Sequence, residues 1–340
     1  MPTIIPDITI AFFFVDALLS RSLSTLVPRE AADQGRSAHS LGTFGVLAGG
    51  KVTPMTDILQ CTPMRAAGTL TPPDFAMPRG ACDTHFHVFE PGYPPVPRPL
   101  YTFPDGTLDA YLRMTERLGI ERMVLVQPSF YGTDNSLLRH VLERLRPRAG
   151  GVVQIDDDTG DSELDEFHEL GVRAIRLDLV AREGWPTAAV IGYIRRMAAR
   201  ATPRGWHLQF YAPGTVVRGL LPFLADYRET FVIDHMGLMT EPDPEFGRRL
   251  LALLGQGSCW IKLSGPYRVA GDKPLSHVAP LGRALVAARP DRLIWGSDWP
   301  HLPDGQRDTG EILNLLAGWA PDEADRRTIL VDGPDRLFFR

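Results

Sequence analysis

Three histidines and one aspartate are the residues of this sequence whose types and spacing best suit catalysis. His85 and His87 form an HxH pair, and alternation along a β-strand places both side chains on the same side. Two imidazoles facing inward can bind a metal ion or polarise a carbonyl group. His235 in the segment IDHMG adds a third imidazole, and Asp298 in GSDWP adds a carboxylate. The four side chains together predict a hydrolase site in which Asp298 activates water, because an aspartate is ionised at neutral pH.

The elements that must position these residues alternate regularly along the chain. Eight short apolar segments predict β-strands, and most are nearly continuously apolar, as strands buried on both faces are. They cover residues 81–85, 122–127, 151–155, 173–177, 206–211, 230–234, 258–263 and 292–295. Helical spacing marks residues 108–118, 135–146, 162–170, 187–200, 216–227, 244–254, 275–288 and 309–319.

Eight strands alternating with helices predict the α/β fold class and, within it, a (β/α)8 TIM barrel, which typically needs ~250 residues. An open doubly wound sheet is the alternative. It is disfavoured because no glycine-rich phosphate-binding motif follows the first strand.

The active site of such a barrel forms at the C-terminal ends of the strands. Polar residues follow the predicted strands at these ends: the histidines and Asp298, and also Ser129, Tyr211 and Arg268. Arg176 lies inside an apolar strand, where an unpaired charge is costly. This placement favours a functional role for Arg176 over a merely solubilising one.

Composition bounds the class of protein. The chain has 340 residues, 44% apolar and 23% charged, with a net charge of −5 and three cysteines. These values are typical of a globular protein and disfavour a nucleic-acid binder, which usually carries a basic excess. Cys61, Cys82 and Cys259 lie far apart, which favours a reducing compartment, and we expect a cytoplasmic protein.

Residues 1–76 do not share the alternation and are predicted to be an N-terminal extension, with the barrel domain at 77–340. The apolar run at 8–15 is shorter than the ~20 residues that a membrane-spanning helix needs. We interpret the extension as sequence upstream of the true start or as a disordered tail. A chain that begins at Met55 or Met64 should therefore fold and remain active.

Several segments resemble the amidohydrolase superfamily. They are CDTHFHVF, VQPSFYGTDN, GVRAIRLDL, FVIDHMG and LIWGSDWPH. Within that superfamily the chain is most similar to the 2-pyrone-4,6-dicarboxylate lactonase group of amidohydrolase-2 proteins, which includes sugar-acid and muconolactone lactonases. The resemblance covers roughly residues 80–340, through all eight strands in order.

The resemblance implies specific roles. His85, His87 and His235 would polarise the scissile lactone carbonyl. Asp298 would deprotonate the attacking water and then protonate the leaving hydroxyl group. The residues implied to bind the substrate carboxylates are Arg176, Arg182, Tyr211 and Arg268, with Ser129 and Tyr101 as further contacts.

Two departures from the pyrone lactonase pattern bear on the substrate. Leu238 follows IDHMG where that enzyme places a further carboxylate-binding arginine, and Leu302-Pro303 stand where it has an asparagine near the substrate. A smaller or less anionic lactone is therefore expected, still carrying one or two carboxylates.

Metal use is a separate question. Binuclear members of the superfamily usually need a carboxylated lysine or a glutamate at the end of the fourth strand, where this chain offers Arg176 and Asp178. A single Zn²⁺ held by histidine and aspartate is chemically compatible with the sequence. The resemblance to the pyrone lactonases favours an enzyme without a cofactor.

The predicted function is the hydrolysis of a small anionic lactone, in the catabolism of aromatic compounds or sugar acids. The alternatives are a mononuclear metal-dependent amidohydrolase or decarboxylase and a non-catalytic anion-binding barrel. We expect a monomer or homo-oligomer, with neither nucleic acid nor a membrane as partner.

Overall fold

The fold is described from a computed structural model, which covers residues 58–240 and 243–340 with their side chains, together with the backbone of two short strands. These are β1 (Val46–Ala48) and β2 (Lys51–Thr53), which pair in antiparallel fashion. The apolar run at 8–15 and Met55 lie outside the described residues.

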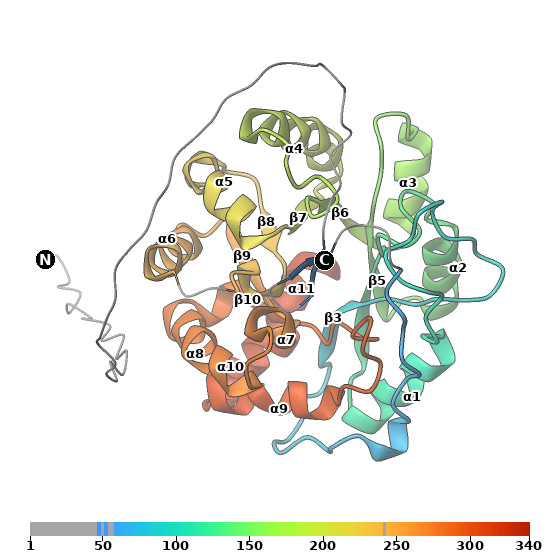
Figure 1. The fold of residues 1–340 in the computed structure, drawn as a ribbon, viewed down its shortest axis with the longest axis vertical. Helices are drawn as coiled ribbons and strands as arrows, with labels where there is room; N and C mark the ends of the chain where they lie inside the picture. The colour runs from blue at the N-terminus through green and yellow to red at the C-terminus, as the bar shows by residue number, and fades with distance from the viewer. Residues whose placement is uncertain (1–45, 49–50, 54–57, 241–242) are drawn as a thin grey trace, which may run out of the picture. The chain divides into compact units, whose positions relative to one another are not determined.

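Eight parallel strands form the central sheet, in sequence order from β3 to β10 (Figure 1). Their bounds are β3 (Cys82–Phe86), β4 (Arg122–Val126), β5 (Ala149–Val153), β6 (Val172–Asp178), β7 (His207–Tyr211), β8 (Phe231–Ile233), β9 (Cys259–Leu263) and β10 (Leu293–Trp295). The prediction of a (β/α)8 barrel is confirmed.

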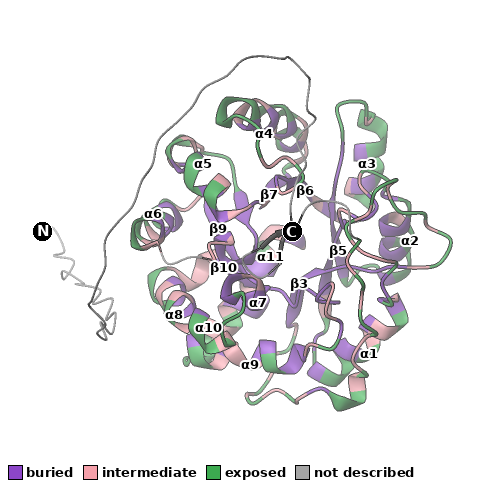
Figure 2. Ribbon diagram, viewed as in Figure 1, coloured by how far each residue is buried: buried purple, intermediate pink, exposed green. Residues whose placement is uncertain are grey.

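Helices surround the strands and bury one side of each against them, as the alternation of buried and exposed residues along the helices shows (Figure 2). The longer ones are α1 (Leu108–Leu118), α2 (Ser136–Leu145), α3 (Asp161–Glu169), α4 (Thr187–Ala201), α5 (Gly214–Asp226), α6 (Pro244–Gly255), α8 (Ala279–Ala288) and α9 (Thr309–Trp319). All eight coincide closely with predicted segments. Helix α1 shows why: the Thr107 side chain caps its first turn, and Gly119 ends it in the left-handed conformation.

Three short helices are not predicted from the sequence. They are α7 (Pro266–Ala270), α10 (Glu323–Arg327) and α11 (Gly333–Phe338). Each is too short to show a helical period. Helix α7 follows β9 at the C-terminal end of the barrel.

The barrel closes between β3 and β10 largely through side chains and loops. Thr84 Oγ1 donates a hydrogen bond to the Trp295 carbonyl at 2.7 Å. The carboxylate of Asp83 accepts bonds from the Ser297 backbone N–H at 2.8 Å and from the Ser297 hydroxyl at 2.6 Å. The Asp298 N–H donates to the His85 carbonyl at 2.8 Å. This seam therefore joins the segments that carry His85 and Asp298.

The barrel interior changes from apolar to polar along the strands. Apolar side chains near the start of the strands, among them Ala174 of β6 and Trp260 of β9, pack in one cluster with Phe338 of α11. Two residues further along β6 and β9, the inward positions are Arg176 and Lys262, both buried. Because side chains alternate between the two faces of a strand, these inward positions place charged groups beneath the C-terminal opening of the barrel.

Strand β3 departs from simple alternation. Its pairing with β4 shifts register between Asp83 and Phe86. Cys82 packs in the interior cluster, and His85 three residues later contacts the interior Lys262. An odd separation between two inward residues requires such an irregularity, because strict alternation would turn one of them outward.

Residues 58–76 contact the barrel loops. Leu59 pairs with Tyr101 through a backbone bridge. The backbone N–H and hydroxyl of Thr71 both donate to Asp308, which also caps α9, and the Leu70 side chain is buried. The division of the chain at residue 76 stays a prediction. No helix among the described residues is long and apolar enough to cross a membrane.

Candidate active site

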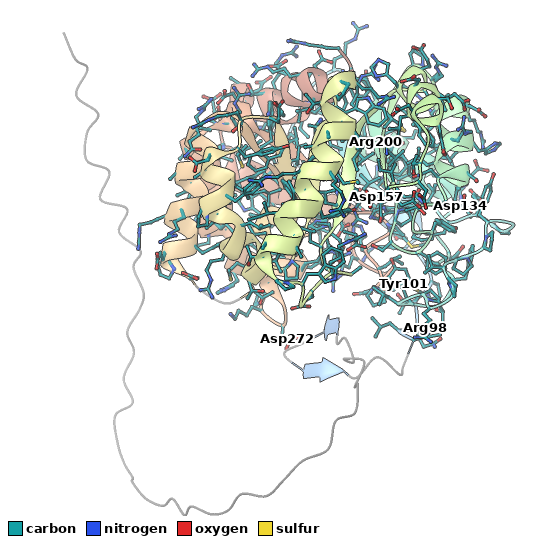
Figure 3. All side chains as sticks on the ribbon, turned by 90° about the horizontal axis from the view of Figure 1, so that it is seen from above. Arg98, Tyr101, Asp134, Asp157, Arg200 and Asp272 are labelled. Atoms are coloured by element: carbon teal, nitrogen blue, oxygen red, sulfur yellow. The ribbon has the colours of Figure 1, made fainter. Side chains whose placement is uncertain are left out.

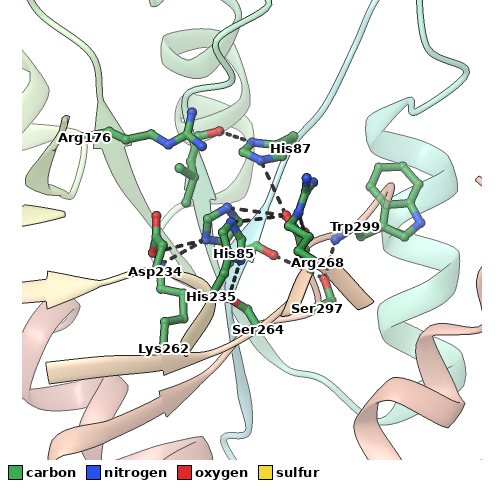
Figure 4. Close-up of polar contacts among 12 residues, drawn as sticks. His85, His87, Arg176, Asp234, His235, Lys262, Ser264, Arg268, Ser297 and Trp299 are labelled. Carbon is green, nitrogen blue, oxygen red and sulfur yellow. Dashed lines mark hydrogen bonds and ion pairs between the residues drawn. The ribbon is translucent and has the colours of Figure 1, made fainter. Parts of the chain in front are cut away.

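The centre of the site is one oxygen of Asp298, which three imidazoles surround. Figure 4 labels these rings as His85, His87 and His235. Asp298 Oδ1 lies 3.7 Å from Nε2 of His85 and 4.0 Å from Nε2 of both His87 and His235. Oδ1 of Asp298 and Nε2 of His85 are buried and have no hydrogen-bond partner among the described residues. Buried polar atoms are usually paired, so two unpaired groups that face each other indicate a place for a polar ligand. The four residues predicted to be catalytic are thus brought together.

The second oxygen of Asp298 is firmly held. Oδ2 accepts a hydrogen bond from the Tyr267 hydroxyl at 2.6 Å and another from Arg268 Nε at 2.6 Å. Burial alone would raise the pKa of Asp298, but the Arg268 guanidinium opposes burial, and the pKa lies well below the usual range. Asp298 is therefore ionised, with Oδ2 anchored and Oδ1 free.

The three imidazoles are neutral. Burial lowers the pKa of His85 well below its ordinary value, that of His87 to about 3 and that of His235 to about 4. Their Nδ1 atoms face partners: the Val126 carbonyl lies 2.7 Å from His87, and the Ser264 hydroxyl lies 2.9 Å from His235. These contacts fix the ring orientations, so that all three Nε2 atoms point toward Asp298.

The backbone that presents these groups is strained. Asp298 has φ of 61° and His235 has φ of 51°, in the left-handed region that side chains other than glycine rarely adopt. Glycines make room nearby. A Cβ atom on Gly265 would lie 2.9 Å from His235 Nδ1 and 3.1 Å from Asp298 Oδ2, and one on Gly296 would lie 2.5 Å from the Cβ of His85. The loops are therefore shaped around the four groups.

Arg176 enters the site as predicted. Its side chain is buried, donates to the Gln127 carbonyl at 3.1 Å and to the Ser129 hydroxyl at 3.3 Å, and lies over the Tyr211 ring at 4.4 Å. Within the described residues its guanidinium forms no ion pair with a carboxylate, and its Nε has no partner. The Tyr211 ring also packs at 5.6 Å from the His235 ring. Ser129, Arg176 and Tyr211 thus adjoin the imidazoles.

Two of the predicted substrate-binding residues lie further out. Tyr101 (Figure 3) comes from the long loop between β3 and α1 and stacks on Phe130. Arg182 donates to the Asp178 carbonyl at 2.8 Å, and its guanidinium lies over the rings of Trp185 and Tyr193. Neither makes a direct contact with the four central groups. Their roles in binding substrate stay predictions.

Four residues of the site were not predicted to act there. Tyr267 anchors Asp298, Ser264 contacts His235, and Lys262 and Asp234 lie on the Nδ1 side of His85. One signal was present in the sequence: Lys262, like Arg176, is a charge inside an apolar strand. Asp234, Ser264 and Tyr267 carry another signal, because each follows a predicted strand at the active-site end of the barrel. That position did not indicate which group each would contact.

Two groups of described side chains have the spacing of metal ligands: His85 with Asp234 and His235, and His85 with His87 and Asp298. Both need an electron pair on a ring nitrogen of His85. Lys262 Nζ lies 3.2 Å from His85 Nδ1, and an ammonium group can only donate. If Lys262 donates to Nδ1, the proton of a neutral His85 resides on Nε2, and neither nitrogen has an electron pair to offer a metal. The residues present do not fit a metal site in this state.

The fold and the site together define a (β/α)8-barrel enzyme of the amidohydrolase type. The chain belongs to the amidohydrolase family, because the family model described as Amidohydrolase matches residues 82–340. The resemblance noted in the sequence is thereby confirmed, with the enzyme class that it implies.

Individual relatives add detail. The chain is 37% identical over 279 residues to 4-sulfomuconolactone hydrolase of Rhizobium radiobacter, which covers 78% of this chain and 92% of that protein. It is 31% identical over 283 residues to D-galactarolactone isomerase of Agrobacterium fabrum, covering 79% and 94%. A crystal structure from Acinetobacter baumannii, described as a 2-pyrone-4,6-dicarboxylic acid hydrolase with citric acid bound, superposes with a TM-score of 0.68 at 26% identity, covering 77% and 100%.

Proposed function

We propose that this protein hydrolyses a small lactone that carries at least one anionic group, with Asp298 as general base. The observation that carries the proposal is the unequal environment of the two oxygens of Asp298. Oδ2 is held by Tyr267 and Arg268, and Oδ1 is unpaired at the point where three imidazoles converge. A buried, ionised carboxylate with one free oxygen can accept a proton from water.

An anionic substrate is supported by Arg176. A buried guanidinium without a carboxylate partner is costly in the free protein, and a substrate anion would supply the missing partner. The fork of an arginine meets a carboxylate or sulfonate with two parallel hydrogen bonds. The relatives named above act on, or bind, molecules with such groups.

The reaction follows from this arrangement. Asp298 Oδ1 takes a proton from water as the water oxygen attacks the lactone carbonyl carbon. Imidazole N–H groups directed at the carbonyl oxygen stabilise the negative charge that develops there. When the ring C–O bond breaks, the proton on Asp298 passes to the leaving oxygen, and the product is an open-chain hydroxy acid. No step needs a metal ion.

We expect a substrate with fewer anionic groups than 2-pyrone-4,6-dicarboxylate. Leu238 and Leu302 stand where the pyrone lactonases have polar contacts, and the Leu302 side chain is buried. Apolar side chains at these points cannot donate to a second carboxylate. A single carboxylate or sulfonate next to Arg176 suits the site better.

A panel of lactones tests the proposal. 4-Sulfomuconolactone, muconolactone, 2-pyrone-4,6-dicarboxylate and D-galactarolactone should be incubated with the protein, with and without a chelator, and the products identified. We expect ring opening of at least one monoanionic lactone, undiminished by chelation. Loss of activity on chelation would indicate the metal-dependent alternative, and a rearranged lactone as product would indicate an isomerase.

The variant Asp298→Asn tests the general base directly. The substitution keeps the size and removes the charge, so we expect a folded protein whose kcat falls by ~10²–10⁴, the usual contribution of general-base catalysis. Steady-state kinetics on the best lactone of the panel measure it. Turnover within a few-fold of the unmodified protein would contradict the role of Asp298. If the unmodified protein bound lactones of the panel but hydrolysed none of them, the non-catalytic anion-binding barrel would be favoured.

A further inference from the structure

A buried polar network lies beneath the imidazoles, on the side of His85 away from Asp298. Lys262 Nζ, which is fully buried, lies 2.9 Å from Gln209 Oε1, 3.2 Å from His85 Nδ1 and 3.2 Å from Asp234 Oδ1. Gln209 Nε2 donates to Asp234 Oδ2 at 3.0 Å. Lys262, Gln209 and Asp234 have no role in the proposed reaction. Figure 4 shows Lys262 and Asp234.

The contacts within this network determine which of its atoms carry protons. Asp234 is ionised: burial would raise its pKa, but the Lys262 ammonium beside it opposes burial, and the pKa lies well below the usual range. A carboxylate can only accept, so the amide of Gln209 turns its NH₂ group to Asp234 and its oxygen to Lys262. An ammonium has three donors and no electron pair, and the N–H that faces His85 must therefore meet an acceptor.

We infer that Lys262 fixes the neutral His85 in the tautomer with its proton on Nε2, and so makes His85 the hydrogen-bond donor of the site. Nδ1 of His85 accepts from Lys262, and Nε2–H points toward the reacting groups. At 3.7 Å from Asp298 Oδ1 this N–H is too distant for a hydrogen bond to it. It is available for the carbonyl oxygen of the substrate.

His87 has the opposite tautomer. Its Nδ1 lies 2.7 Å from the Val126 carbonyl, which can only accept, so the proton of His87 resides on Nδ1 and Nε2 carries an electron pair. That pair lies 4.0 Å from Asp298 Oδ1. A water molecule can donate one hydrogen to each of these two acceptors, which leaves an electron pair on its oxygen for attack.

His85 and His87 thus have different roles in the proposed reaction. His85 donates to the carbonyl oxygen as negative charge develops there, and His87 helps to hold the water whose proton passes to Asp298. Lys262 touches neither substrate nor water and is a positioning residue, which acts through the tautomer of His85. The catalytic part of this inference rests on the proposed function, whereas the tautomers themselves do not.

One rival arrangement exists on the same side of His85. Asp234 Oδ1 lies 3.6 Å from His85 Nδ1. If that carboxylate accepted a hydrogen bond from His85, the proton would reside on Nδ1 and Lys262 would have no influence. The distance is long for a hydrogen bond, and Lys262 is closer, but the two arrangements predict different spectra.

Nitrogen-15 NMR of the protein labelled at histidine decides between them. Protonated and unprotonated ring nitrogens have well separated shifts, and the rings can be assigned from His85→Gln and His87→Gln spectra. We expect Nε2–H for His85 and Nδ1–H for His87 in the unmodified protein. A proton on Nδ1 of His85 overturns the inference. Because no substrate is added, this result is independent of whether the protein hydrolyses lactones.

The variant Lys262→Met tests the role of Lys262. It leaves the carboxylate of Asp234, which can only accept, as the polar group nearest to His85 Nδ1. We expect His85 to switch to Nδ1–H, donating to that carboxylate. His87, whose partner is backbone, should keep its tautomer and serves as the internal control. An unchanged His85 overturns the inference, and if the variant does not fold, the spectrum of the unmodified protein decides.

Kinetics and metal binding of Lys262→Met give two further results. Loss of one donor to a developing oxyanion costs about 10²–10³ in kcat, with little change in KM, because ground-state binding of the anion is left intact. Titration with zinc chloride alone should show at least 10-fold tighter binding to the variant, since Nε2 of His85 regains its electron pair. Tight binding of zinc through His85 in the unmodified protein would overturn the inference.

Discussion

At the scale of single residues, the chemistry depends on keeping buried imidazoles neutral next to a carboxylate. An imidazolium beside Asp298 would form an ion pair with Oδ1, which would then be a weaker base. Burial prevents this by lowering the pKa of each histidine. The site therefore holds an ionised base and neutral imidazoles at the same pH.

This arrangement predicts an unusual pH profile. A histidine with a lowered pKa is neutral above that pKa and becomes charged as the pH falls through it. The pKa of His235 is about 4 and that of His87 about 3, so kcat/KM should stay level down to about pH 5 and fall with an apparent midpoint near 4. Initial rates between about pH 3 and 8 at constant ionic strength measure this midpoint. A midpoint near 6.5, the ordinary value for histidine, would contradict the assigned environment.

The residues proposed to react were predictable from the sequence, whereas the residues that hold them in place were not. His85, His87, His235 and Asp298 follow apolar strands in short motifs, and strand ends of a barrel converge. Tyr267 and Ser264 reach the site from α7 and the end of β9, and nothing in the local sequence says which side chain they will meet. The choice between donor and acceptor among the histidines depends on Lys262 and Val126, which are distant in sequence.

At the scale of elements, the loops after β8, β9 and β10 form one tightly fitted set. His235, Gly265 and Asp298 all have left-handed backbone conformations, and the position of a Cβ on Gly265 lies within 3.1 Å of atoms of His235, Arg268 and Asp298. Such contacts leave no room for displacement of one loop without another.

Gly265→Ala should therefore damage the site, and Gly205→Ala is a matched control. Gly205 has φ of 66°, also left-handed, but a Cβ there meets nothing within 4 Å. Both variants should lose about 1–2 kcal/mol of unfolding free energy, the cost of a left-handed alanine. Only Gly265→Ala should lower kcat/KM, by at least ~10-fold, because misplacing reacting groups by a fraction of an ångström is costly. Denaturant titrations and kinetics of the pair measure both effects. Equal kcat/KM in the two variants would exclude a positional role for Gly265.

The eight strands and eight longer helices were predictable because burial on both faces and helical spacing leave strong signals. The register shift in β3 was not. A shift of pairing depends on how β4 lies beside β3, and this is a property of two segments far apart in the chain. Without it Cys82 and His85 could not both face the interior.

At the scale of the molecule, the segment before the barrel is part of the described structure. Thr71 donates twice to Asp308, which also accepts from the first turn of α9. The Leu70 side chain is 4% exposed. These contacts tie residues 58–76 to the last third of the barrel.

Two truncations measure what this segment contributes. A chain that begins at residue 58 keeps the described contacts and should unfold at the same temperature as the full chain. A chain that begins at residue 77 loses the buried Leu70 and the Thr71 bonds, and should lose about 3 kcal/mol or more of unfolding free energy. The melting temperatures of the two truncated chains and of the full chain measure the difference. Equal melting temperatures would mean that the segment only lies against the barrel.

The seam between β3 and β10 has a consequence for how the protein is made. His85 is near the beginning of the barrel and Asp298 near its end, and the bonds from Ser297 to Asp83 join the two segments that carry them. A nascent chain that still lacks its last strand also lacks Asp298, the proposed base. Enzymatic activity should therefore appear only when the barrel closes between β3 and β10. During refolding, the recovery of activity should lag behind the recovery of the circular dichroism signal.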